Sequence, residues 1–253
     1  MKRMKRLATG AAFAALLALA ACTAQPAPPA DTASPAPSAA AAEVTNVYYP
    51  VAIGNTWTYR MAFPDPIGVV TETETMTAMS PEGDGMRVTT ERSFHHENGA
   101  VPDYSDSVDY VFHDDGSIDV PYQTVPDASG AQVVVTGGTM VWPTVDEFEA
   151  GIPKTGTITA EVTTAGATYE QSVDFTVAGA GTQDVTVAAG TFAGARALKQ
   201  DLLISIPSLG VSGLPVSATT WLAEGTGPVK TEVAEVLGTG PIVVELVKFT
   251  PGE

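Results

Sequence analysis

Short alternations of apolar and polar residues recur along most of this chain. They occur at 71–79, 85–94, 156–164, 169–177, 183–190, 195–206, 216–224 and 229–237. Each places apolar or small side chains on one face and Thr, Glu, Asp, Lys or Arg on the other, the period of a half-buried β-strand. Glycine-containing segments at 81–85, 164–168, 179–183, 223–227 and 237–240 predict hairpin turns between them. Sequential strands joined by short turns predict an antiparallel meander.

The apolar face of such a sheet has to be covered. The fold class expected is therefore all-β, or β with a minor helix: a curved antiparallel meander sheet that forms a half-barrel, a barrel or a sandwich. The segment PTVDEFEAG (143–151) predicts one helical turn with acidic residues at its start. The less regular region 95–155 could separate two sub-sheets. The apolar segment 204–217 predicts either a bulged or long connection over the open end of the sheet or an apolar lip for a lipid or partner protein.

The first 21 residues have the plan of a signal peptide, with four Lys and Arg residues before a short apolar run. That run is shorter than the ~20 residues that span a bilayer. The segment Leu19-Ala20-Ala21-Cys22 resembles the bacterial lipobox, in which the cysteine becomes lipid-modified. Cys22 is the only cysteine, so the chain has no intrachain disulfide and no cysteine cluster for zinc. Cys22 is therefore the expected lipidation site.

Three segments with different roles follow from this pattern. Residues 1–21 are the expected lipoprotein signal peptide, 22–46 the lipidated cysteine with an Ala/Pro-rich tether, and 47–253 a single antiparallel β-domain. The expected location is the bacterial cell envelope, extracytoplasmic and lipid-anchored to a membrane through Cys22. A diacylglyceryl group would supply the two chains that stable anchoring needs. Inner and outer membrane both remain open.

The charge of the chain excludes one class of partner. The formal net charge is −17, and removing the basic signal segment leaves eight Lys and Arg against 29 Asp and Glu, about −21. Such an acidic body repels nucleic acid and anionic lipid surfaces, so no nucleic-acid partner is expected.

No assembled catalytic or cofactor motif is present. The glycines in AEGTGPVK (223–230) lack the spacing of a phosphate-binding loop and predict a hairpin turn. FHDDGSIDV (112–120) matches few positions of a calcium loop and predicts a hairpin with an Asp-Gly turn. His95 and His96 point to opposite faces of a strand, so at most one of them could join His113 in a metal site. Catalytic, cofactor-binding and metal residues are therefore all assigned as none.

Three stretches resemble motifs of an uncharacterised family of bacterial lipoproteins and secreted proteins. YYPVAIGNTWTYRM (48–61) resembles YxPLxxGNxWxY, VTVAAGTFAGARAL (185–198) resembles VxVPAGTFxxxxxL, and TTWLAEGTGPVKTE (219–232) resembles xxWYAxGVGLVKxE. Leu222 replaces the usual aromatic residue, and Thr226 and Pro228 replace Val and Leu. The family's function is not established, so the resemblance implies no catalytic residues. Such chains are also similar to the half-barrel lipoprotein carriers, in which a curved antiparallel sheet shelters acyl chains.

The motif residues also have a structural interpretation. Large aromatic side chains are expected to anchor the core, with Trp57 and Trp221 both buried on strands that are close in space. AGTF (189–192) predicts a tight turn. The residues interpreted in this way are Tyr49, Gly54, Asn55, Trp57, Tyr59, Gly190, Phe192, Trp221, Gly225, Gly227 and Lys230.

The expected function is a non-enzymatic, membrane-anchored lipoprotein whose β-domain binds a lipid, a peptide or an envelope partner. The alternatives are a metal- or carboxylate-dependent envelope hydrolase and a passive structural component of the envelope.

Overall fold

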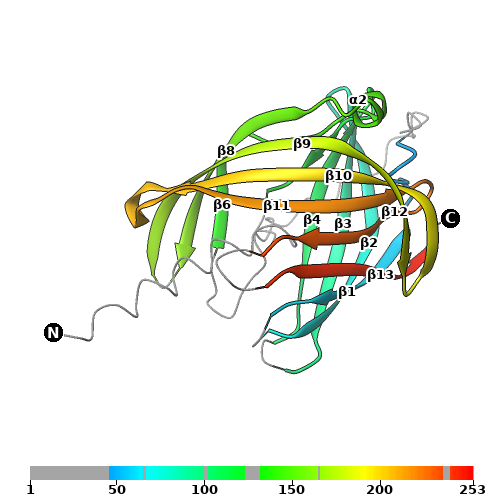
Figure 1. Cartoon of the computed structure of the whole chain (residues 1–253), viewed down its shortest axis with the longest axis horizontal. Helices are drawn as coiled ribbons and strands as arrows, with labels where there is room; N and C mark the ends of the chain where they lie inside the picture. Colours follow the sequence, from blue (N-terminus) through cyan, green and yellow to red (C-terminus); the bar gives the residue numbers. More distant parts are fainter. Residues whose placement is uncertain are drawn as a thin grey trace, which may run out of the picture.

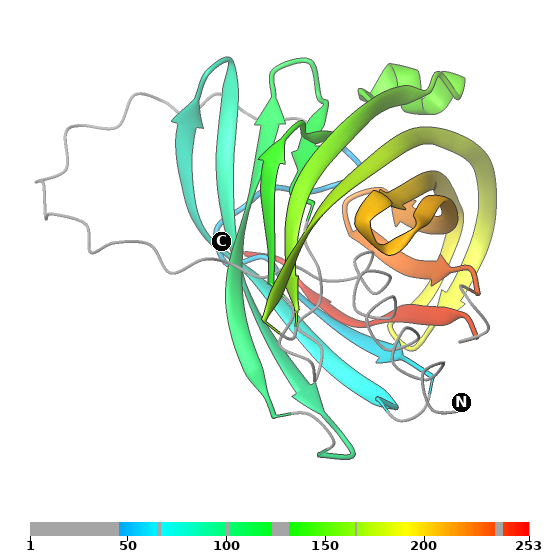
Figure 2. The ribbon, with the colours of Figure 1, turned by 90° about the vertical axis from the view of Figure 1, so that its left-hand side faces the viewer.

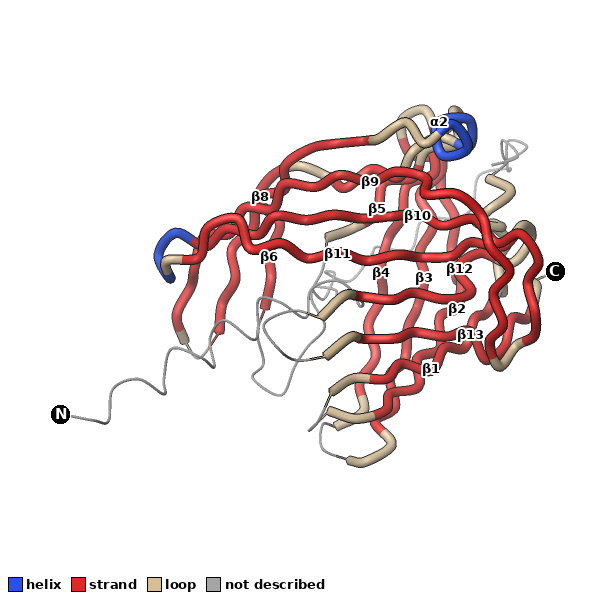
Figure 3. The backbone as a smooth tube through the Cα atoms, in the orientation of Figure 1, coloured by secondary structure: helices blue, strands red, loops and turns tan. Residues whose placement is uncertain are grey.

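The computed structural model describes residues 46–64, 67–99, 102–122, 132–164, 166–235 and 240–252. Within these ranges, thirteen strands form one sheet in the order β6-β8-β9-β10-β11-β12-β13-β1-β2-β3-β4-β5-β7. All the pairings are antiparallel. The protein is therefore all-β with one short α-helix, and its sheet is curved but not closed into a barrel (Figures 1 and 3). Cys22 lies outside the described residues.

The strands vary greatly in length. The first seven are β1 (Thr56–Ala62), β2 (Val69–Glu82), β3 (Gly85–His96), β4 (Tyr104–His113), β5 (Ile118–Val120), β6 (Gln132–Gly137) and β7 (Met140–Trp142). After α2 (Val145–Ala150) come β8 (Lys154–Thr164), β9 (Ala167–Val187) and β10 (Gly190–Ile206). The 3₁₀ turn η1 (Pro207–Leu209) precedes β11 (Val211–Ala223), β12 (Gly227–Val233) and β13 (Ile242–Thr250).

Two meanders make up the sheet, and the ends of the domain join them. Strands β1 to β5 form one meander and β8 to β13 form the other. The last strand, β13, pairs with the first, β1, from Thr56↔Thr250 to Ala62↔Val243. The first and last parts of the domain are therefore neighbours in one sheet. Figure 2 shows the two meanders curving around a common interior, with β2–β4 and β9–β11 on different sides of it.

The edges of the sheet come together near α2 without pairing. Strand β6 lies at one edge and β7 at the other, and only Gly138 and Thr139 connect them. Strand β7 lies close to β8 and β9 there. Gly138 has a φ of +77°, and a Cβ at this position would lie 2.1 Å from the backbone oxygen of Thr157. The connection therefore requires glycine. The region 95–155, expected to separate two sub-sheets, instead supplies both edges of a single sheet.

The helical turn predicted at 143–151 is present and well capped. Thr144 and Glu147 form a capping box, and Gly151 ends α2 in the left-handed conformation. The turn predicted at 179–183 is wrong, because β9 runs through it without interruption. At Gly179 a Cβ would lie 1.9 Å from the backbone oxygen of Phe148 in α2. This glycine therefore allows close packing of α2 on the strand, and Gly181, with a φ of +89°, accompanies a register shift there.

The loop within the segment 204–217 is shorter than expected. Strands β10 and β11 remain paired as far as Ile206↔Val211, and η1 with Gly210 connects them. Of the two forms expected, a bulged or a long connection, the long connection is wrong because most of the segment is strand, whereas an irregularity in register does occur between Ile204 and Ile206. Leu209 at the hairpin tip is 36% exposed, so one apolar side chain does face solvent there.

Candidate functional site

The first and third motifs meet in a structural junction. The indole Nε1 of Trp57 donates to the backbone oxygen of Thr226 at 2.6 Å, and the Tyr59 hydroxyl donates to that of Pro228 at 3.1 Å. Trp57 and Trp221 are 1% and 9% exposed, so both have the burial expected of them. Two aromatic side chains of β1 therefore hold the turn between β11 and β12.

The remaining residues of the first motif fix the start of β1. The side chain of Asn55 is 2% exposed, donates to the oxygen of Pro50 and accepts from the amide of Gly252. The amide of Gly54 donates to the oxygen of Met76 on β2, and its φ is +87°. Tyr49 packs on the ring of Trp57 at 5.8 Å. These contacts attach the segment before β1 to β2 on one side and to Gly252, near the end of the domain, on the other.

The second motif forms the turn between β9 and β10. The amide of Ala189 in this turn donates to the oxygen of Leu246 on β13, so the hairpin end lies on the sheet next to the first motif. Gly190 has a φ of +139°, and Phe192 packs on the core while partly exposed. The three motifs thus meet at β1, β12 and β13. Segments that are far apart in the sequence are neighbours in the folded sheet.

The glycines and lysine of the third motif form a turn and a strand. Gly225 and Gly227 have φ values of +67° and +94°. Lys230 lies on β12 opposite Trp221, with Nζ 5.6 Å from the indole ring and 2.7 Å from Glu232. The Lys230 ammonium is thus engaged by the ring and by Glu232, and β12 is a strand where a phosphate-binding loop would need a helix.

The histidines do not gather in one site. His95 faces outward and contacts Asp103 at 2.7 Å, whereas His96 is buried on the inner face. His113 contacts Asp84 at 3.0 Å near the opposite end of β3, on the order of 30 Å away for a strand of this length. These carboxylates raise the pKa of His95 and of His113, while burial lowers the pKa of His96.

The Asp-Gly turn predicted at 114–116 is present between β4 and β5. Gly116 has a φ of +81°, and Asp115 accepts from both the amide and the hydroxyl of Ser117. Asp115 thereby stabilises the turn. Within the ranges that the structure describes, no three His, Cys, Asp or Glu side chains are arranged to hold a metal ion.

A row of charged side chains lies on the inner face of β2, β3 and β4, and sequence analysis did not single it out. Register places Glu74 opposite Arg92 and Arg92 opposite Asp106, while Glu72 is two residues from Glu74 on the same face. We call Glu72, Glu74, Arg92 and Asp106 the polar row. One signal was available: in TETETM (71–76), both glutamates share a face with Met76, which is fully buried.

Arg92 is the centre of the polar row. Its Nη2 donates to both oxygens of Asp106 at 2.6 Å, and its Nη1 lies 3.6 Å from Oε1 of Glu72. The side chains of Arg92, Glu72 and Asp106 are 1%, 4% and 6% exposed. The guanidinium also lies over the ring of Phe94, 5.0 Å from its centroid. One buried cation therefore faces three carboxyl groups.

Burial shifts the protonation of all three acids. Burial raises the pKa of Glu72 well above its usual range, and repulsion by Glu74 adds to this. It also raises the pKa of Glu74, against the opposing effect of Arg92. Burial raises the pKa of Asp106 to about 6, again despite Arg92. The contact between the two glutamates further raises the pKa of Glu72 and works against the rise in the pKa of Glu74.

The inner face of β8–β11 has the opposite character. Register carries buried apolar side chains across all four strands, for example Ile158↔Val173, Phe175↔Leu202 and Leu202↔Val216. We call this surface the apolar wall; its members are Ile158, Ala160, Val162, Val173, Phe175, Val177, Leu202, Ile204, Ile206, Val216 and Ala218, each at most 4% exposed. The apolar wall thus lacks the charged side chains that the polar row places among the buried apolar residues of β2, β3 and β4.

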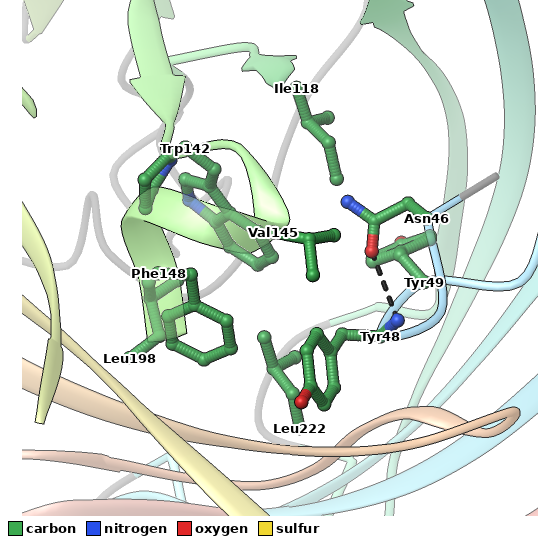
Figure 4. Close-up of a pocket in the computed structure, with 10 residues that line it drawn as sticks. Asn46, Tyr48, Tyr49, Ile118, Trp142, Val145, Phe148, Leu198 and Leu222 are labelled. Carbon is green, nitrogen blue, oxygen red and sulfur yellow. Dashed lines mark hydrogen bonds between the residues drawn. The ribbon is translucent and has the colours of Figure 1, made fainter. Parts of the chain in front are cut away.

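A small cavity lies at the end of the interior covered by α2. Its lining includes Tyr49, Trp142, Phe148 and Leu222, and Figure 4 shows these side chains converging on it. The dashed line marks the amide of Tyr48 donating to Oδ1 of Asn46 at 3.0 Å. The cavity measures about 10 Å³. A volume of ~10–15 Å³ holds one water molecule, so a larger ligand does not fit there.

Comparison with solved structures identifies the fold. No protein-family model and no curated protein matches the chain significantly. A candidate exported protein with a YmcC-like fold from Bacteroides fragilis aligns with a TM-score of 0.56 at 16% identity, over 81% of this chain and 99% of its own. A candidate lipoprotein from Parabacteroides distasonis aligns with a TM-score of 0.59 at 12% identity, over 81% and 98%. At these identities, the likeness extends to the fold alone.

Among the residues that the structure covers, no helix is long and apolar enough to cross a membrane.

Proposed function

We propose that the chain is an extracytoplasmic lipoprotein, anchored to a membrane through Cys22, whose β-domain binds an acyl chain without catalysing a reaction. The lipobox-like segment and the Ala/Pro-rich tether support the anchor. Two proteins of similar fold are described as an exported protein and a lipoprotein, which is consistent with the same location for this chain.

The apolar wall is the observation that carries the binding role. Four adjacent strands present buried aliphatic and aromatic side chains on the concave side of a curved sheet. An acyl chain gains ~0.8 kcal/mol for each CH₂ group moved from water to such a surface. The resemblance to half-barrel lipoprotein carriers agrees with this choice of ligand.

Ligand entry requires the closed interior to open. The wall side chains are covered in this structure, so an acyl chain has to displace the groups that cover them. The sheet offers a place for this, because its edge strands β6 and β7 are not joined by a ladder of hydrogen bonds. Separating the edges leaves every strand pairing of the described sheet intact.

The hydrolase alternative has one observation in its favour, the three carboxyl groups of the polar row. Arg92 holds Asp106 in a two-oxygen contact, and the side chain of Glu72 is 4% exposed. A hydrolytic site needs its acid and base within reach of substrate and water. Arg92 engages both oxygens of Asp106, and within the described residues no group of side chains is arranged to hold a metal ion beside these carboxyl groups, so acyl-chain binding is the better-supported function.

Extraction of the native protein tests the proposal. The full-length lipoprotein is purified from its own membranes in a mild detergent, and bound molecules are identified by native mass spectrometry. A lipid bound in a fixed stoichiometry, in excess of that on an unrelated lipoprotein from the same membranes, is the expected result. A copurified protein in place of lipid would indicate an envelope partner, and a consistently empty domain would indicate a structural component; either result overturns acyl-chain binding.

A further inference from the structure

Strand β5 has a short backbone attachment to the sheet on one of its sides. In the described sheet it pairs with β4 at two positions, Val111↔Asp119 and Phe112↔Ile118. On its other side, all three of its residues pair with the edge strand β7. Strand β5 therefore joins β7 to the first meander through a two-residue ladder, so side-chain contacts across this ladder affect how firmly the edge is held.

His113, the last residue of β4, contacts two segments that flank it. Its Nδ1 lies 3.0 Å from Oδ1 of Asp84, in the turn between β2 and β3. Its Nε2 lies 3.3 Å from Oδ1 of Asp119 on β5. The side chains of His113 and Asp119 are 24% and 30% exposed, whereas that of Asp84 is 81% exposed. We call these three residues the histidine clasp, in which the contact to β5 is the better shielded from water.

The two contacts determine the protonation of the ring. A carboxylate only accepts hydrogen bonds, and a neutral imidazole has a single N–H to donate. The imidazolium ion has two, one on each nitrogen. Because both nitrogens of His113 face carboxylate oxygens, the observed arrangement requires the charged ring. Loss of one proton leaves a bare nitrogen lone pair against one of the two aspartates.

The surrounding carboxylates favour that charged ring. The hydrogen bond with Asp84 raises the pKa of His113, Asp119 adds to the rise, and partial burial opposes it. The same hydrogen bond lowers the pKa of Asp84. In the turn between β4 and β5, Asp114 is exposed, and the pKa of Asp115 is lowered mainly by Ser117 and in part by the charge of His113.

The cations of the neighbouring elements are engaged elsewhere. Arg87, which shares the outer face of β3 and β4 with His113, contacts Glu82 and Asp109. Lys154 on β8 contacts a glutamate of α2 at 2.7 Å. Among the residues that the structure describes, neither aspartate of the histidine clasp has a second cationic partner. The hold of the clasp on β5 therefore depends on the charge of His113.

We propose that the histidine clasp is a pH-sensitive switch, which holds β5 when His113 is charged and loosens β5 and β7 when His113 loses its proton. Because β7 is an edge of the sheet, the switch acts where the proposed acyl chain enters. It does not depend on acyl-chain binding, since its contacts are present in the free domain.

The direction of the pH dependence follows from the raised pKa of His113. An unfolded histidine has a pKa of about 6.5, so the contribution of the clasp is fully present below that value. It is lost as the pH rises through the pKa of the folded His113. Strand β5 should therefore be held at about pH 6 and loosened at about pH 9.

Hydrogen–deuterium exchange measures the opening of β5 directly. The full-length protein in a mild detergent is labelled at about pH 6 and about pH 9, and the rates are corrected for the intrinsic effect of pH. Strand β12, in the middle of the sheet, serves as the reference for global stability. We expect the protection of β5 and β7 relative to β12 to fall by about two- to fivefold, the size that partly exposed ion pairs support.

Two variants and a control localise the effect. His113→Gln keeps a neutral polar side chain that does not titrate, so the protection of β5 should no longer change with pH. Asp119→Asn removes the charged contact to β5 and should also abolish most of the change if His113→Gln fails to fold. His95→Gln is the matched control, because His95 contacts an aspartate on the outer face at the other end of β3. It should keep the wild-type dependence on pH.

Nitrogen-15 NMR of the histidine rings gives a second readout. Both ring nitrogens of His113 should be protonated at about pH 6.5, and Asp119→Asn should lower the pH at which the second proton leaves. A single neutral tautomer of His113 at that pH overturns the proposal. Protection of β5 that is unchanged by pH in the wild type, or that changes equally in His113→Gln, overturns it as well. These outcomes leave acyl-chain binding in place, which lipid extraction tests separately.

Discussion

At the scale of single residues, the arginines Arg92 and Arg87 of β3 show how burial changes the worth of an ion pair. The side chain of Arg92 is 1% exposed and holds Asp106, whereas that of Arg87 is 38% exposed and contacts Glu82 and Asp109. Exposed pairs contribute little because water screens them. A buried pair that loses its cation leaves uncompensated carboxylates in the core.

Arg92→Met should therefore destabilise the domain by ~3–5 kcal/mol. Arg87→Met, the matched control on the outer face of the same strand, should change stability by ~0–1 kcal/mol. Urea denaturation of both variants gives the comparison. Equal midpoints would show that the polar row is solvated rather than buried.

The pKa of Asp106 predicts a specific dependence of stability on pH. Its value of about 6 in the folded state exceeds the ~3.9 of an unfolded aspartate, so folding favours the neutral acid. That contribution is fully present below about pH 4 and is lost as the pH rises through about 6. The stability of wild type relative to Asp106→Asn should thus fall between pH 4 and pH 7. Parallel stability curves for the two proteins would contradict the assigned shift.

At the scale of elements, the accuracy of sequence-based prediction depended on whether local pattern decides the structure. The hairpin at 114–116 and the helix at 145–150 follow from an Asp-Gly turn and a capping box, which are local signals. The continuous β9 could not be predicted, because the role of Gly179 depends on a helix packed across it. The polar row required the register of β2, β3 and β4, since a glutamate on an alternating strand normally faces solvent.

The close approach of α2 to β9 gives a prediction at the same scale. Gly179→Ala would place a Cβ against the backbone oxygen of Phe148, so either α2 or the strand has to shift. Overpacking of this kind costs ~1–3 kcal/mol. In the control Gly137→Ala, the nearest atom is the side-chain hydroxyl of Thr159, which can rotate away. If Gly179→Ala lowers the thermal midpoint no more than Gly137→Ala does, α2 is not packed tightly on β9.

At the scale of the whole molecule, the sequence predicts a lipid anchor and a tether ahead of the curved sheet. The tether of residues 23–43 consists mostly of Ala, Pro, Ser and Thr, which favours an extended spacer. Under the proposed function, such a spacer would let the β-domain reach the membrane surface. Its net negative charge keeps it from adhering to anionic lipid headgroups.

Loss of the lipidation site should separate the domain from the membrane. Cys22→Ser should release the protein into the soluble fraction or leave its signal segment uncleaved, because this residue is the predicted attachment point of the acyl chains. Thr23→Ser, which keeps the cysteine, serves as the control and should fractionate with the membrane. If Cys22→Ser stays in the membrane fraction and migrates on a gel as the wild type does, the lipid anchor is contradicted.

Site-specific photo-crosslinking in the living envelope tests the central claim, that acyl chains enter the interior of the sheet. Benzoylphenylalanine replaces Leu214, which register places beside Ile204 of the apolar wall, or Leu203, which is 48% exposed on the outer face. After illumination, the two proteins are analysed for lipid adducts by mass spectrometry. We predict a lipid adduct at Leu214 and little or none at Leu203. Equal labelling of the two positions, or no lipid at Leu214, would contradict the proposal.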